Sequence, residues 1–376
     1  MPTSPRPYAG GLEGVVVGET RLSQVEGQAG RLTLAGFPVE TLAPTVSFEA
    51  ALFLLWHDRI PSDDELRILT TELAAARTLP QAVTDVLRAA AQIDAPPMHA
   101  LRLGIAALSL RNPTPTDIVG AMATLVSAYV RLCAGHEPVA ADAGDDHATA
   151  VLAMLTGERP TPAAVRALST YLVTVCDHGM NASTFTARVV ASTGSDLGAA
   201  VEAALGALQG PLHGGAPGPA LEALMALRAQ QDGSTLDART RRWVTAEVEA
   251  GRRIMGFGHR VYRVRDPRAD VLQRAAQRLL DDSEAGRALA SDARCHERAV
   301  LETLRALKPD RPIATNVEFF TALLLHGLGL PTHLFTPVFA VGRVAGWTAH
   351  FAEQRANGRL IRPSVAYVGA QDRRLH

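Results

Sequence analysis

Helix signals recur along almost the whole chain, and they limit the fold more than any other feature of the sequence. Ser47 precedes a segment whose apolar residues follow helical spacing, and Ser62 with Glu65 forms a capping-box pattern for the next segment. Further helices are expected over 99–110, 116–133, 162–175, 197–208, 219–231, 238–250, 267–281, 284–307 and 338–355, and another starts near Ser183. The run 315–330 is expected to return the chain to the first domain. Short β-branched runs between glycines over 11–39 predict only small strands or a hairpin. We therefore expect a mainly α fold.

Length and composition limit the class of protein. A chain of 376 residues, 47% hydrophobic and 20% charged, can bury a large core and is long enough for two domains. The breaker-rich loop Leu212–Gly218 is the expected domain crossing. A net charge of −1 argues against a general nucleic-acid binder.

Cysteine usage and apolar runs indicate the compartment. The three cysteines are widely spaced and have neither metal-ligand nor disulfide spacing, which fits a reducing compartment. Met1–Gly14 has no apolar core of a signal peptide, and the longest apolar run, Ala50–Trp56, is far shorter than the roughly 20 residues of a membrane helix. We expect a cytoplasmic protein without a metal site or a bound redox cofactor.

The stretch Met255–Arg268 carries the densest chemical signal. Gly256 and Gly258 allow the backbone to expose its N–H groups beside His259. Asp266 followed by proline indicates a helix start, which places Arg268 in the first turn, where the helix dipole is already positive. A cation there needs an anion, so the stretch predicts a site for a small, multiply charged anion. The alternative is an ordinary loop in an arginine-rich chain, in which Lys308 is the only lysine.

Two other histidines stand at predicted helix ends. His178 falls at a helix C-terminus before Gly179, where the negative end of the dipole favours the imidazolium; the alternative is a helix-capping histidine. His213 precedes a helix that begins at Pro217–Pro219, and a helix N-terminus favours a neutral imidazole that can donate a hydrogen bond. A simple turn histidine is the alternative for His213.

Glu318 and Arg343 each allow a structural and a functional interpretation. Thr315 and Glu318 match a capping box, which would lower the pKa of the carboxyl group, whereas a catalytic carboxylate would have to face a cleft. Arg343 is the only charged residue between Leu334 and Glu353, so it needs an anionic partner. That partner could be a substrate carboxylate, which suits the guanidinium fork, or a carboxylate of the protein.

Several separate motifs, in order along most of the chain, resemble the citrate synthase family. They are G-L-E-G-V-V-V-G-E-T at Gly11–Thr20, S-F-E-A-A-L-F-L-L-W-H at Ser47–His57, D-H-G-M-N-A-S-T at Asp177–Thr184, G-P-L-H-G-G-A at Gly210–Ala216, M-G-F-G-H-R-V-Y at Met255–Tyr262, D-P-R at Asp266–Arg268 and N-V-E-F-F at Asn316–Phe320. The resemblance implies a homodimer with a large helical domain, residues 1–214 and 331–376, and a smaller helical domain, residues 215–330, that closes over the substrates. It also implies the condensation of an acyl-CoA with oxaloacetate, as in the tricarboxylic acid cycle.

The resemblance implies a role for each motif residue. His213 would hydrogen-bond the thioester oxygen, Glu318 would take the proton next to the thioester, and His259 would polarise the oxaloacetate ketone. The carboxylates of oxaloacetate would be held by His178, Arg268, Arg343 and, from the other subunit, Arg362. CoA would be bound by Arg253, Ile254, Met255, Gly256, Phe257, Gly258 and Arg263.

One departure from the family pattern concerns the base. The family most often has aspartate where this chain has Glu318, and the extra methylene moves the carboxylate by about 1 Å, a displacement that can cost roughly 10²-fold in rate. Three functions therefore stay open: a citrate synthase using acetyl-CoA, a 2-methylcitrate synthase using propionyl-CoA, and a catalytically weak relative that binds CoA or a dicarboxylate. One methylene in a pocket is worth only about 1–3 kcal/mol, so the sequence does not separate the first two.

Overall fold

The computed structural model describes residues 10–12, 14–214, 217–259 and 261–374. Its small antiparallel sheet has the order β1-β2-β3, with Ser23 opposite Leu34 in the first hairpin and Leu34 opposite Phe37 in the second. The strands are β1 (Ser23–Glu26), β2 (Arg31–Leu34) and β3 (Phe37–Pro38). The predicted hairpin is confirmed.

Helices make up the rest of the fold, and the prediction of a mainly α chain is confirmed. The α-helices of the first half are α1 (Val39–Leu42), α2 (Phe48–His57), α3 (Asp63–Ala76), α4 (Gln81–Gln92), α5 (Pro97–Ser109), α6 (Pro115–Cys133), α7 (His147–Thr156) and α8 (Pro162–Val175). Those of the second half are α9 (Ala182–Ser192), α10 (Leu197–Leu208), α11 (Pro217–Ala229), α12 (Leu236–Glu249), α13 (Pro267–Leu280), α14 (Glu284–Leu307), α15 (Val317–Gly327) and α16 (Phe335–Asn357). Short 3₁₀ turns are η1 (Gly10–Leu12) and η2 (Thr332–Leu334).

Local capping explains many of these boundaries. Ser47 accepts a hydrogen bond from the Ala50 N–H at the start of α2, and Ser62 forms the predicted capping box with Glu65 at the start of α3. Asp266 caps α13 with Pro267 at its first position, as the sequence predicts. These starts require only neighbouring residues, which is why the sequence is sufficient to place them.

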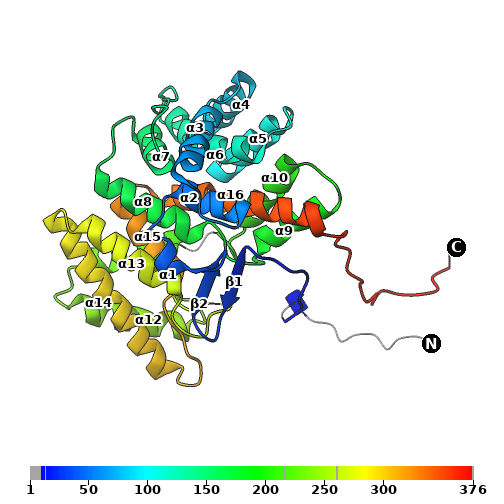
Figure 1. Cartoon of the computed structure of the whole chain (residues 1–376). Coiled ribbons are helices and arrows are strands. Elements are labelled where there is room, and N and C mark those ends of the chain that lie inside the picture. The colour runs from blue at the N-terminus through cyan, green and yellow to red at the C-terminus, as the bar shows by residue number, and fades with distance from the viewer. Residues whose placement is uncertain (1–9, 13, 215–216, 260, 375–376) are drawn as a thin grey trace.

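Helix α16 lies at the centre of the fold. It packs against α2, α6, α8, α9 and α10, and Trp347 and Val344 on it have no exposed surface. Figure 1 shows α3–α7 at one end of the molecule and α12–α14 at the other, with α8, α9 and α16 between them. The segment that follows α16 is extended and runs away from the helical body.

Helix α6 is the one described helix long and apolar enough to cross a membrane, and 67% of its most apolar window is buried. It packs against α3, α4, α5, α7 and α16. Its composition is thus that of a helix enclosed by other helices of the same chain.

Candidate active site

Three histidines from distant parts of the sequence form the centre of the candidate site. His178 follows α8, His213 precedes α11, and His259 lies in the connection between α12 and α13. The imidazole centroids of His178 and His259 are 5.8 Å apart, and His178 Nε2 lies 3.1 Å from the hydroxyl of Tyr262. His213 is close enough to His178 to contribute to the lowering of its pKa.

His178 is not the imidazolium that its position predicts. Helix α8 ends at Val175 with Cys176 as its C-cap, so His178 lies beyond the last helical turn. Burial, followed by the nearby cations Arg268 and Arg343, lowers the pKa of His178 well below its usual range. The prediction of a protonated His178 is wrong, because its burial and its two arginine neighbours depend on segments far away in the sequence.

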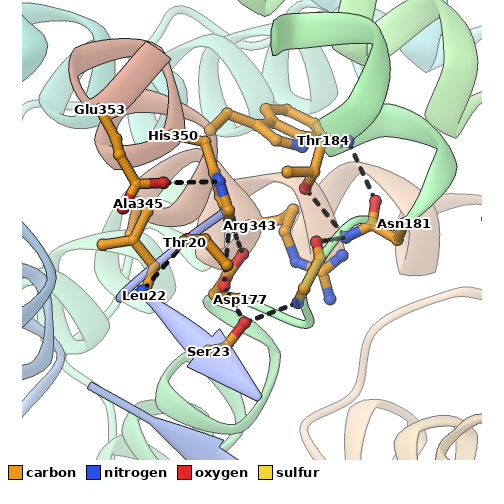
Figure 2. A network of polar contacts seen from close by, with 12 residues as sticks. Thr20, Leu22, Ser23, Asp177, Asn181, Thr184, Arg343, Ala345, His350 and Glu353 are labelled. Atoms are coloured by element: carbon orange, nitrogen blue, oxygen red, sulfur yellow. Dashed lines mark hydrogen bonds and ion pairs between the residues drawn. The ribbon is translucent and has the colours of Figure 1, made fainter. Parts of the chain in front are cut away.

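The turn that carries His178 is fixed on both sides by polar contacts. The hydroxyl of Ser23, on β1, accepts a hydrogen bond from the Gly179 N–H at 2.7 Å and donates to the Asp177 carboxylate at 2.5 Å. On the other side, Asp177 pairs with His350 of α16 at 3.2 Å (Figure 2). The sequence analysis missed these contacts, although a lone carboxylate directly after an apolar helix is a signal for a buried partner.

His213 is a neutral hydrogen-bond donor. Its Nε2 lies 3.4 Å from the Ser183 N–H and 2.8 Å from the Ser183 hydroxyl. Because a backbone N–H can only donate, Nε2 accepts and the ring proton is assigned to Nδ1. Burial lowers the pKa of His213 to about 4. The prediction of a neutral imidazole is confirmed, but the helix whose first turn contacts it is α9, not α11.

His259 has the opposite tautomer for the same reason. Its Nδ1 accepts from the backbone N–H groups of Val261 and Tyr262, at 3.0 and 3.1 Å, so the proton is assigned to Nε2. Burial, with a further contribution from Arg268, lowers the pKa of His259 to about 4. His213 and His259 are therefore neutral imidazoles like His178, and each has one ring N–H without a hydrogen bond to the described residues, which can polarise a carbonyl oxygen.

Two buried arginines supply the positive charge. Arg268 is held by Asp266, with Nε–Oδ1 and Nη2–Oδ2 distances of 3.0 and 2.7 Å. The anion expected near Arg268 is thus partly provided by the chain itself. Arg343 donates from Nε to the Val175 carbonyl at 2.6 Å and lies over the Phe339 ring.

Arg343 has no carboxylate partner within 4.0 Å in the described part of the chain. Burial lowers its pKa to about 10, against a smaller opposing effect of Asp177. A protein carboxylate as its direct partner, the structural alternative, is therefore contradicted. A buried guanidinium group without an ion pair is suited to bind an anionic ligand.

Glu318 is not part of a capping box. The N-cap of α15 is Asn316, whose side-chain oxygen accepts from the Glu318 N–H at 3.1 Å. The Thr315 hydroxyl instead donates to Glu297 at 2.6 Å. Glu318 as a residue is half-buried, but its carboxylate oxygen Oε2 is buried and has no hydrogen-bond partner among the described residues, and burial raises the pKa of the carboxyl group to about 7. A carboxylate with this pKa can act as a general base near neutral pH.

The glycine loop packs against the start of α15. Phe257 pairs with Thr315 in an isolated β-bridge, and the Gly258 N–H donates to the Ala314 carbonyl at 2.8 Å. The expectation that this N–H is free is therefore wrong. Gly256 and Gly258 have φ values of 86° and 81°, which favour glycine, while Arg253 and Arg263 at the ends of the predicted CoA-binding stretch are exposed. Ile254 and Phe257 are buried, and Met255 is half-buried.

Comparison with known proteins places the chain in a family. The model described as "Citrate synthase, C-terminal domain" matches residues 11–364. The chain belongs to the citrate synthase family. A citrate synthase of Haloferax volcanii is 39% identical to it over 96% of both chains. A 2-methylcitrate synthase of Shewanella oneidensis is 34% identical, covering 97% of this chain and 96% of its own.

Solved citrate synthase structures confirm the fold. The ternary complex of carboxymethyl coenzyme A and oxaloacetate with the Thermoplasma acidophilum citrate synthase superposes with a TM-score of 0.86 at 27% identity, covering 99% of this chain and 98% of that one. Membership of the citrate synthase family makes the chain a condensing enzyme that transfers a group.

Arg362 is the fourth predicted oxaloacetate ligand, and unlike His178, Arg268 and Arg343 it is not buried. It is exposed in the extended segment after α16 (Figure 1). Its predicted contact with a second subunit stays a prediction. Residues 215–216, which belong to the predicted domain crossing, lie outside the described residues. So does Arg260, next to His259. Among the residues that are described, no cluster of histidine, cysteine or acidic side chains could hold a metal ion.

Proposed function

We propose that this protein is a citrate synthase that condenses acetyl-CoA and oxaloacetate, with water, to citrate and CoA. The observation that carries the proposal is Glu318: one oxygen of its carboxylate is buried without a partner in the described chain, and burial raises its pKa to about 7. Two neutral imidazole donors and two buried arginines belong to the same site. A related structure whose title names carboxymethyl coenzyme A and oxaloacetate together supports this substrate pair.

The first step is removal of a methyl proton from acetyl-CoA. The Glu318 carboxylate takes the proton, and the C–H electron pair moves to the thioester oxygen as the enol or enolate forms. His213 Nδ1–H donates a hydrogen bond to that oxygen, because an acid as weak as a thioester C–H needs its developing negative charge stabilised. Glu318 ends this step protonated.

The second step forms the carbon–carbon bond. The enol carbon attacks the ketone of oxaloacetate as the thioester carbonyl re-forms, and His259 Nε2–H polarises the ketone oxygen. That oxygen takes up one proton, which balances the proton removed in the first step, and becomes the hydroxyl of the citryl thioester. His178, Arg268 and Arg343 hold the oxaloacetate carboxylates, and Arg362 of a second subunit completes the set. Water then cleaves the thioester and releases citrate and CoA.

CoA binding is assigned to the stretch Arg253–Gly258 and to Arg263. The two arginines are exposed, which allows them to bind phosphates, while the positive-φ glycines let the backbone approach the ligand closely.

We also propose a homodimeric, cytoplasmic enzyme with a smaller domain over 215–330 that closes on the substrates and excludes water. It uses no cofactor beyond the CoA thioester, and its place is the tricarboxylic acid cycle.

A 2-methylcitrate synthase is the second candidate, favoured by the relative at 34% identity that carries this function. The test is thiol release with oxaloacetate, comparing acetyl-CoA and propionyl-CoA at equal concentrations. We expect kcat/KM to favour acetyl-CoA by about 10-fold or more, which corresponds to the roughly 1–3 kcal/mol of one methylene. A preference for propionyl-CoA would move the assignment to 2-methylcitrate synthase.

The third possibility, a catalytically weak relative, rests on Glu318 as a helix cap. Since Asn316 caps α15, no observation favours it. Absence of turnover with both thioesters, in a folded protein that binds oxaloacetate, would nevertheless restore it.

The pH dependence of turnover tests the base directly. Glu318 acts only when ionised, and burial raises its pKa to about 7 against the lowering effect of Arg268, with Asp266 opposing Arg268. We expect kcat/KM for acetyl-CoA to fall about tenfold per pH unit as pH drops below 7. His213 and His259, with pKa values of about 4, stay neutral over this range. An acid limb centred near pH 4.5 would contradict a raised pKa of the base.

A further inference from the structure

The sequence at the start of α15 allows a second way of capping this helix, which the structure does not adopt. Thr315-x-x-Glu318 matches a capping box, in which the Thr315 hydroxyl would accept from the Glu318 N–H and the Glu318 carboxylate would turn back to the Thr315 N–H. In the structure, Thr315 and Glu318 make neither contact, and Asn316 caps the helix one residue later. Something outside this segment therefore decides between the two arrangements.

Glu297 on α14 is the hydrogen-bond acceptor of the Thr315 hydroxyl. Its Oε1 accepts from Thr315 at 2.6 Å, and the same oxygen pairs with Arg265 Nη1. Arg265 is in turn held by Asp270 at 2.5 Å and by Gln273 at 2.9 Å. Glu297 and Thr315 are only 8% and 1% exposed, so water does not compete strongly for this contact.

Two backbone contacts favour the same arrangement. The Thr315 carbonyl accepts from the Asp266 N–H at 3.2 Å, and the Asn316 N–H donates to the Gly256 carbonyl at 3.1 Å. The Asn316 side-chain nitrogen donates to the Gly258 carbonyl at 2.8 Å. Asn316 is thereby held extended, with ψ of 179°, whereas a cap at Thr315 would require it to become the first helical residue.

We infer that Glu297 is a positioning residue for the reaction: by binding the Thr315 hydroxyl, it prevents the Thr315–Glu318 capping box and leaves the Glu318 carboxylate free to act as the base. The hydrogen bond that the Thr315 hydroxyl donates to the Glu297 carboxylate fixes the direction of the Thr315 side chain. In that direction the hydroxyl does not accept from the Glu318 N–H, which donates to Asn316 instead. The inference rests on the proposed function of Glu318. It names no new contact with substrate, because Glu297 acts only through Thr315.

The test uses Glu297→Ala, Thr315→Val and the double variant. We expect Glu297→Ala to lower kcat about 10- to 100-fold, because a released Thr315 draws Glu318 into the cap, and displacement of a base by about 1 Å can cost roughly 10²-fold. Thr315→Val cannot form the box, so its kcat should stay within about threefold of the wild-type value. The double variant should recover most of the loss, to within about threefold of Thr315→Val.

Recovery in the double variant separates positioning from a merely structural role. If Glu297 only stabilised the fold, removing Thr315 as well would leave the double variant as slow as Glu297→Ala or slower, and this result would overturn the inference. Glu297→Gln keeps an acceptor for Thr315 and should retain near wild-type kcat. In Glu297→Ala, the acid limb of the pH profile should also move below pH 7, since a capping carboxylate has a lowered pKa.

A matched control is available on the same helix. Glu302 also pairs with an arginine, Arg241 of α12, at 2.5 Å, but makes no hydrogen bond or ion pair with Thr315 or with α15 in the described part of the chain. Glu302→Ala should leave kcat and the pH profile unchanged. If Glu318→Gln abolishes turnover while Glu297→Ala behaves like this control, the base assignment stands and the positioning role of Glu297 is wrong. If Glu318→Gln leaves turnover intact, the proposed function fails first.

Discussion

Replacing Glu318 with glutamine is expected to lower kcat by about 10³-fold or more while leaving the KM for oxaloacetate within about threefold of the wild-type value. Glutamine keeps the shape of the side chain but cannot take a proton, and general base catalysis contributes roughly 10²–10⁴-fold. Steady-state thiol release with acetyl-CoA and oxaloacetate measures both parameters. Turnover within tenfold of the wild type would show that Glu318 is not the base.

The same variant is expected to gain stability above pH 7. The pKa of Glu318 is raised from its ordinary value of 4.5 to about 7, so ionisation costs the folded state free energy as pH rises from the lower value to the higher one. At about 1.4 kcal/mol per pH unit, the cost is on the order of 3 kcal/mol at pH 8. Glutamine removes this cost, so urea unfolding at pH 8 should show a more stable variant that is nearly inactive.

Glu49→Gln is the matched control for Glu318→Gln. Glu49 is another buried glutamate whose pKa burial raises, but it lies on α2 and accepts from the His147 N–H. Its replacement should leave kcat and the pH profile of thiol release unchanged. Equal losses of kcat in both variants would indicate damage to the fold and not loss of the base.

The second large effect is expected for Arg343→Leu, which should raise the KM for oxaloacetate about 10²–10³-fold and the KM for acetyl-CoA by no more than about threefold. Removing one partner of a buried charge pair costs about 2–5 kcal/mol, and in the complex that partner is a substrate carboxylate. Binding of oxaloacetate alone, followed by calorimetry, measures the loss without the chemical step. Comparable losses of affinity for both substrates would contradict the role of Arg343.

Arg343→Leu should not destabilise the ligand-free protein. Burial lowers the pKa of Arg343 to about 10, which shows that the cation is disfavoured there until an anion arrives. Leucine removes this penalty, and we expect a thermal midpoint equal to or above that of the wild type, but without stabilisation by oxaloacetate. Arg77→Leu is the control: Arg77 is also buried and donates to one backbone carbonyl, that of Asp145, away from the three histidines. It should leave oxaloacetate affinity unchanged.

The sequence alone was sufficient to predict a structural feature where the interacting residues are neighbours in the chain. The capping of α2, α3 and α13 involves residues at most three positions apart, so composition and spacing alone predict these helix starts. The order of the family motifs likewise identified the family, since each motif is a continuous string. The set of candidate residues, including the three histidines and the two buried arginines, was therefore available from the sequence.

Protonation states and partners were decided only by the tertiary structure. His178 is neutral because it is buried and because Arg268 and Arg343 approach it. His213 is contacted by the first turn of α9, not by the helix that follows it. One carboxylate oxygen of Glu318 is buried without a hydrogen bond among the described residues, Asn316 caps α15, and the Thr315 hydroxyl donates to Glu297 from another helix. Burial and charge act through space, so a pKa depends on groups that sequence spacing does not bring together. The sequence determined which residues could act, and the folded chain determined the protonation state and contacts of each.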